Sequence, residues 1–164
     1  MDKKGSLIQW LVHIQKSYNA TLFLCSLVLA YRVIYYSSPQ GAFYFDSIPL
    51  LGIKTTDQGL ILAFILVMAG LISIWTSVQV VLWKRAYRSI SDGSSMDIIY
   101  IPGVLNAPRP IKIAVGIFLF WVVSTAYASS TRRPDIPWLI VCLLFYAVYL
   151  LPLIISPNRK ALCK

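Results

Sequence analysis

Residues 59–83 decide the fold class, and they read GLILAFILVMAGLISIWTSVQVVLW. The run contains no charged side chain. A helix needs about 20 consecutive apolar residues to cross the hydrocarbon core of a bilayer, and a strand of a soluble protein is much shorter. The stretch therefore predicts a membrane-spanning helix from Gly59 to Trp83.

Three further apolar runs accompany this stretch, at residues 17–37, 113–130 and 138–155. Hydrophobic residues make up 58% of the 164-residue chain, and the mean hydropathy is +0.70. Soluble domains contain about 45–50% apolar residues. The sequence therefore predicts an all-α protein, namely a four-helix bundle integral to a membrane, in which residues 1–164 form a single membrane domain.

Lys and Arg are distributed unevenly among the segments that flank the four runs. Most of them fall within residues 1–16, 84–112 and 156–164, and few fall within residues 38–58 and 131–137. Because cationic residues gather on the cytoplasmic side of membranes, we expect both termini and the middle loop in the cytoplasm. The net charge of +9 has the same explanation. Nucleic-acid binding is disfavoured, because the sequence has no basic stripe within a soluble fold.

The N-terminal arm, residues 1–16, has its own helical signal. Ser6 and Gln9 have the spacing of a capping box, and apolar residues follow at helical intervals. The arm is predicted to form a short interfacial helix or the first turns of the first span. His13, the only histidine, is expected on its polar face and not as a ligand or a base.

Arg32 is a cation within the first apolar run, near its outer end. Its long side chain can reach the outer headgroups, or it can pair with Asp46, with Asp57 or with an acidic residue of another protein. Five aromatic residues follow between positions 35 and 45. They suit either an aromatic belt at the headgroups or a recognition surface. The candidate partner-binding residues are Arg32, Tyr35, Tyr36, Phe43, Tyr44, Phe45 and Asp46.

Small and weakly polar residues recur along two of the predicted spans, which is typical of helix-packing faces in membranes. The predicted packing seam consists of Gly59, Ala63, Gly70, Ser73 and Ser77 in one span and Ala114, Thr125 and Ala128 in the other. A pore lining is the alternative reading of the same pattern. Pro152 is expected to bend the last span and to leave the carbonyl of Val148 without its helical partner.

Catalytic chemistry has little support in this sequence. The chain contains six aspartates and no glutamate, and neither Asp nor His occurs within the apolar runs. There is no HExxH motif, and the three cysteines form no CxxC pair. We therefore expect no enzyme, no metal site and no cofactor. An enzyme acting on lipid would require one of its loop aspartates, which are Asp46, Asp57, Asp92 and Asp97.

The function that best fits these features is non-catalytic binding of another membrane protein through helix packing and the aromatic outer loop. The chain would then be an accessory subunit of a membrane complex, or a blocker of the immunity or exclusion type. A small homo-oligomeric channel or carrier is the alternative. The layout is similar to that of small bacterial proteins of these classes, although no motif identifies a family. It suggests the bacterial inner membrane, with membrane lipids and another membrane protein, or a second copy of the chain, as partners.

Overall fold

The computed structural model describes residues 3–37, 58–90, 103–130 and 136–156. Within these ranges the chain forms four α-helices, a single 3₁₀ turn and no strand. The elements are α1 (Lys3–Ser37), α2 (Gln58–Ile90), η2 (Val104–Asn106), α3 (Arg109–Ser130) and α4 (Ile136–Ile155). The predicted all-α class with four helices is confirmed.

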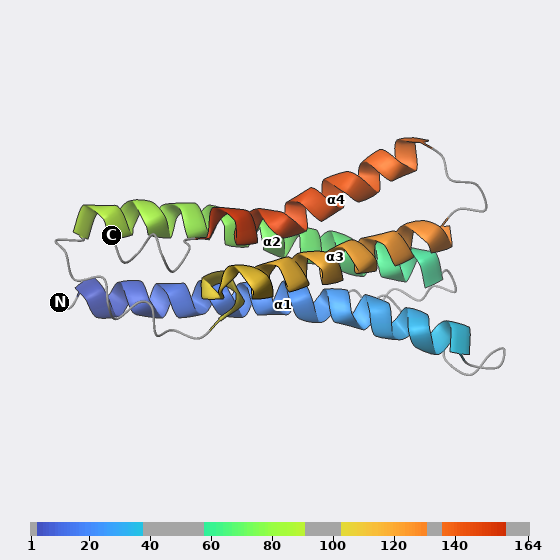
Figure 1. The fold of residues 1–164 in the computed structure, drawn as a ribbon, viewed down its shortest axis with the longest axis horizontal. Helices are drawn as coiled ribbons and strands as arrows, with labels where there is room; N and C mark the ends of the chain where they lie inside the picture. The colour runs from blue at the N-terminus through green and yellow to red at the C-terminus, as the bar shows by residue number, and fades with distance from the viewer. Residues whose placement is uncertain (1–2, 38–57, 91–102, 131–135, 157–164) are drawn as a thin grey trace.

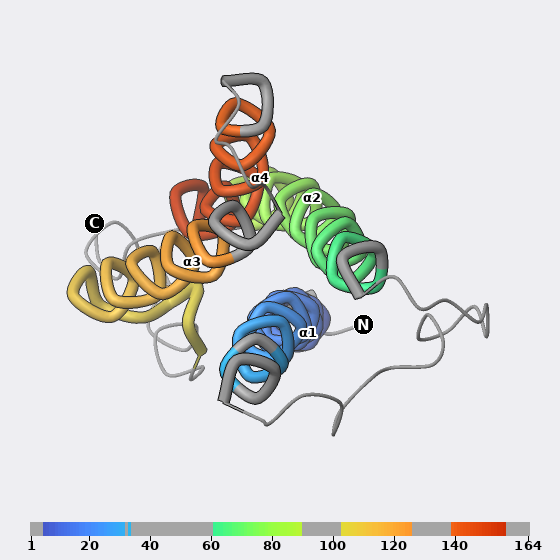
Figure 2. Tube along the Cα trace, turned by 90° about the vertical axis from the view of Figure 1, so that its right-hand side faces the viewer, coloured from blue at the N-terminus to red at the C-terminus, as the bar shows by residue number. Residues whose placement is uncertain are grey.

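The four helices alternate in direction, so the beginnings of α1 and α3 and the ends of α2 and α4 lie toward the same end of the molecule (Figure 1). The most extensive helix contact is between α1 and α2, followed by α2 with α4 and α3 with α4. The contact between α1 and α3 is smaller. Two antiparallel pairs are therefore joined chiefly through α2 and α4, as the view along the helices also shows (Figure 2).

The N-terminal arm does not form a helix of its own. Residues 3–37 are one continuous helix, so the separate interfacial helix predicted for residues 1–16 is replaced by the first turns of α1. The reason is that the buried stripe of α1 passes from the arm into the apolar run without a break. Its members are spaced alternately by four and three residues, and they are Leu7, Leu11, Ile14, Tyr18, Thr21, Cys25 and Val28. No proline or glycine interrupts this register.

Two tryptophans attach the arm to α2. The indole N–H of Trp83 donates to the carbonyl oxygen of Leu7 at 3.0 Å, and that of Trp10 donates to Oε1 of Gln79 at 2.8 Å. The ring of Trp83 also stacks on Tyr87 with 5.2 Å between ring centroids. As a result, the first part of α1 and the last part of α2 continue together beyond the ends of α3 and α4 (Figure 1).

Large apolar side chains cover much of the outside of the bundle. The most exposed examples are Ile154 at 72% and Ile117 at 65%, and every helix contributes others. Among the described residues, one helical stretch, Ile61–Ser89, is both long and apolar enough to cross a membrane, while the apolar stretch Leu139–Ile155 is shorter. By length and composition alone, this is weak support for a membrane position.

Candidate functional site

Helix α4 changes direction part-way along its length (Figure 1), and the interior of the bundle has a polar centre in this region. Pro152 has no N–H group, so the carbonyl of Val148 lacks its helical hydrogen bond. The hydroxyl of Ser73, a buried side chain of α2, donates to this carbonyl oxygen at 2.9 Å. A side chain of one helix thus replaces the main-chain donor that proline removes from another.

Two buried tyrosines extend this centre to a third helix. The hydroxyl of Tyr18 in α1 donates to the carbonyl oxygen of Tyr149 at 3.1 Å. The hydroxyl of Tyr149 in turn donates to the carbonyl oxygen of Leu66 in α2 at 2.7 Å. Both tyrosines are fully buried. We call this set the polar junction; it consists of Tyr18, Leu66, Ser73, Val148 and Tyr149.

Two glycines lie where α4 comes close to its neighbours, at positions where a large side chain would not fit. A methyl group placed on Gly70 of α2 would lie 3.4 Å from the ring of Phe145, and one on Gly116 of α3 would lie 3.5 Å from Leu150. The carbonyl oxygen of Gly116 also accepts a hydrogen bond from the hydroxyl of Tyr146 at 3.3 Å. Small residues therefore face α4 from both sides, as membrane helix packing generally requires.

The residues of the predicted packing seam differ in burial. Gly70, Ser73 and Ser77 are buried, whereas Ala63 and Ala114 are exposed. Ala63 lies near the start of α2, where α4 diverges from its neighbours toward Ile136 (Figure 1).

The remaining seam residues lie on α2 and α3. Thr125 is partly buried and bonds to carbonyls of its own helix, at 3.0 Å to Trp121 and 2.8 Å to Val122. Gly59 and Ala128 belong to α2 and α3, but the burial of their side chains is not described.

The predicted partner-binding residues are mostly not described. Arg32, Tyr35 and Tyr36 belong to the last turns of α1, and their side chains are not placed. The other four, Phe43, Tyr44, Phe45 and Asp46, lie outside the described residues. The structure therefore does not test whether these residues lie together.

Sequence reasoning missed a surface of α1, which we call the α1 outer face. It consists of Asn19, Ala20, Phe23, Ser26 and Ala30, all of them exposed. The outer surface of α4 is different, because it presents mainly large aliphatic side chains: Leu139, Ile140, Leu143, Leu144, Leu151 and Ile154. The signal was present in the sequence as residues spaced by three and four on the side of the helix opposite its buried stripe.

Reactive groups are sparse in the part of the chain that is described. No group of three or more His, Cys, Asp or Glu side chains that could hold a metal occurs there. Cys25 and Cys142 are free thiols and buried. All six aspartates lie outside the described ranges.

The described residues define an all-α protein of four helices. Its interior is mainly apolar with a few buried polar groups, and large apolar side chains also lie on its outside. The chain matches no protein-family model, and no curated protein or solved structure matches it.

Proposed function

We propose that this chain is a non-catalytic integral membrane protein that binds another membrane protein. The observation that carries the proposal is the apolar outside of the bundle, combined with hydroxyl groups inside it that bond to main-chain carbonyls. Ser73, Thr76 and Ser77 point inward and bond to main-chain carbonyls at 2.7–2.9 Å, while large aliphatic and aromatic side chains point outward. In lipid, apolar surface has no reason to be buried and polar groups must be satisfied internally.

Helix lengths support a specific placement in the bilayer. Helices α3 and α4 contain 22 and 20 residues, which corresponds to about 30 Å and matches a hydrocarbon core. Helices α1 and α2 contain 35 and 33 residues and continue past the core on one side. That side contains Lys84, Arg85 and Arg88, so the proposal places it in the cytoplasm together with both termini. The proposed membrane is the bacterial inner membrane.

The α1 outer face is the proposed surface for packing against the partner. Ala20, Ser26 and Ala30 allow a second helix to approach closely, and weakly polar side chains such as Asn19 can bond across a helix interface. The hydroxyl of Ser26 already bonds to the carbonyl oxygen of Leu22 at 2.8 Å, so it is held against the helix and leaves room for a neighbour.

The aromatic outer loop is the second proposed contact. It follows the end of α1 on the outer side and combines Tyr35, Tyr36 and residues 43–46 with the cation Arg32. Aromatic residues with few charges are typical of binding hot spots. An accessory subunit or a blocker of the immunity or exclusion type would use both contacts.

The channel or carrier alternative requires polar side chains that face a pathway. The hydroxyls of Ser73 and Ser77 both bond to main-chain carbonyls, of Val148 and Ser73 respectively. These contacts favour a packing role for the serine stripe. We expect no solute flux from the purified protein in liposomes.

The test is co-purification from the native membrane in a mild detergent, with matched variants. Ala20→Leu and Ala30→Leu add bulk to the α1 outer face, and we expect each to reduce recovery of the partner. Ala147→Leu is the control, because it makes the same change at an exposed position of α4. The proposal fails if wild-type protein is repeatedly recovered alone, or if all three variants behave like the wild type.

A further inference from the structure

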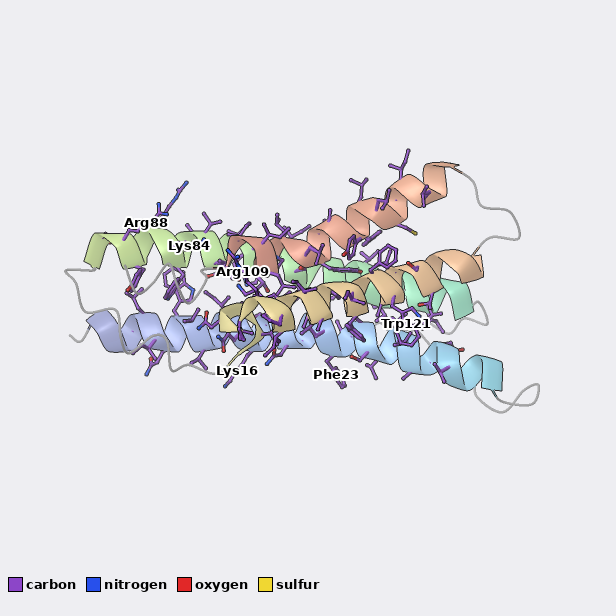
Figure 3. The ribbon with its side chains drawn as sticks, viewed as in Figure 1. Lys16, Phe23, Lys84, Arg88, Arg109 and Trp121 are labelled. Carbon is purple, nitrogen blue, oxygen red and sulfur yellow. The ribbon has the colours of Figure 1, made fainter. Side chains whose placement is uncertain are left out.

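Cations occur in the last part of α2 and in the first turn of α3, at one level of the molecule (Figure 3). Lys84 and Arg88 are one turn apart on α2, and Arg109 and Lys112 occupy the first turn of α3. Figure 3 shows Lys84 and Arg109 at the same level of the molecule, with Arg88 directed outward. We call Lys84, Arg109 and Lys112 the basic cluster.

Lys112 is fixed in position by the end of α4. Its Nζ donates to Oγ of Ser156 at 2.6 Å, and this Oγ donates to the carbonyl oxygen of Leu153 at 2.8 Å. Ser156 is buried. An ammonium group has three N–H donors, so this bond orients the group and leaves two donors for a ligand.

The cluster lacks a counter-charge within the described ranges. No carboxylate is present there, since every aspartate lies outside them. Burial, and then the nearby charge of Lys84, lower the pKa of Lys112. Bringing like charges together in a partly dry position is unfavourable, and an anion bound between them removes this cost.

Exposed apolar side chains lie within two positions of these cations along α2 and α3. Leu82 is 42% exposed, Ile111 is 48% exposed and Ile113 is 62% exposed. A free anion would gain nothing from these surfaces, whereas the acyl chains of a lipid would cover them. The combination of cations, one of them held in place by Ser156, with exposed apolar side chains at the same level of the helices matches the two ends of a phospholipid.

We propose that Lys84, Arg109 and Lys112 bind the phosphate group of an anionic phospholipid of the cytoplasmic leaflet. This inference rests on the membrane position argued above. The cluster lies at the level where α3 begins and α4 ends (Figure 3), which that position puts among the headgroups. The lipid would hold the start of α3 against α2, two helices that have little direct contact.

The experiment uses the full-length protein in a non-ionic detergent and measures retained lipid by native mass spectrometry. Phosphatidylglycerol, phosphatidylcholine and inorganic phosphate are the three probes. We expect selective retention of phosphatidylglycerol, and no competition from inorganic phosphate at the same concentration. Lys84→Gln leaves the bond from Lys112 to Ser156 intact, and it should weaken retention about fivefold. The double variant with Lys112→Gln should weaken it about 25-fold.

The matched control removes two exposed cations elsewhere, through Lys16→Gln and Arg85→Gln. It should stay within about threefold of the wild type, since exposed charges act weakly over distance. Equal losses in both double variants would overturn the proposal, and so would full competition by inorganic phosphate. A protein that stays in solution without detergent would refute the membrane position itself, whereas unselective lipid retention by a detergent-extracted protein would refute the lipid site alone.

Discussion

Ser73 of α2 donates its hydroxyl hydrogen to the carbonyl oxygen of Val148 in α4, at 2.9 Å, and this carbonyl is the one that Pro152 deprives of a helical donor. The bend of α4 and the contact between α2 and α4 are therefore one feature. Tyr18 adds a second bond at the next carbonyl, that of Tyr149. Main-chain groups freed by proline inside membrane proteins are commonly satisfied by Ser or Thr of a neighbouring helix.

Replacing Ser73 with alanine should destabilise the bundle by about 1 kcal/mol, because the carbonyl of Val148 is left unpaired in the interior. Thermal unfolding in detergent measures the effect. Ser77→Ala is the control, since its hydroxyl bonds only within its own helix, at 2.9 Å to Ser73, and its effect should be smaller.

Pro152→Ala provides the decisive cross-check of the same contact. It restores an N–H group that can bond to Val148 within α4. In the Pro152→Ala background, Ser73→Ala should cause a smaller loss of stability, so the effects of the two substitutions on stability should not be additive. Strict additivity of the two effects would contradict the role assigned to Ser73.

The sequence was sufficient to predict four helices, the bend at Pro152 and the freed carbonyl of Val148. It also placed Ser73 and Gly70 on a packing stripe. It did not predict that Ser73 bonds to Val148, because this requires α2 and α4 to be neighbours in one particular register, and short-range patterns carry no information on that. Ala63 lies on the same stripe yet is exposed, since exposure there depends on the divergence of α4.

The arm shows a second limit of the sequence. The capping box at Ser6 and Gln9 predicts that a helix begins after Ser6, but α1 begins at Lys3, so Ser6 lies inside its first turns and does not cap it. Whether the helix stops again depends on tertiary contacts such as those from Trp83 to Leu7 and from Trp10 to Gln79. These bonds connect residues about 70 positions apart in the chain, which no local pattern reveals.

Gly70 offers a test of the close contact between α2 and α4. Gly70→Ala should be neutral or stabilising by up to about 1 kcal/mol, because alanine favours helix and its methyl group would lie in ordinary contact, 3.4 Å from Phe145. Gly70→Leu should destabilise by about 2 kcal/mol through overpacking. Unfolding midpoints of the two variants in the same detergent decide the matter, and a tolerated leucine would refute the close approach.

Gly103 precedes the 3₁₀ turn and packs directly on the side chain of Gln15. A methyl group at Gly103 would overlap the carboxamide of Gln15, which is 5% exposed. The backbone of Gly103 is extended, with φ of 170°, so the cost of Gly103→Ala is steric and should be about 1–2 kcal/mol.

The cross-check for Gly103 is the second substitution Gln15→Ala. Nε2 of Gln15 has no hydrogen-bond partner among the described residues, so truncation loses little there and opens the space that the new methyl group needs. The double variant should recover most of the stability lost by Gly103→Ala. A double variant that is less stable than either single one would refute the contact.

The position of Lys112 should make the stability of the protein depend on pH. Burial and the charge of Lys84 lower its pKa in the folded protein, relative to about 10.4 for an exposed lysine. Between these two values the unfolded chain binds more protons than the folded chain, so the stability contributed at this position increases as pH rises. Below the lowered value both states are protonated, and the cost of the buried charge is fully present.

The unfolding midpoint of the wild type, minus that of Lys112→Gln, should therefore increase from neutral pH toward about pH 10.4 in non-ionic detergent without anionic lipid. Adding phosphatidylglycerol should reduce this slope, because a bound phosphate supplies a counter-charge and raises the pKa again. Parallel curves for the two proteins in detergent would show that Lys112 is solvated like an ordinary surface lysine.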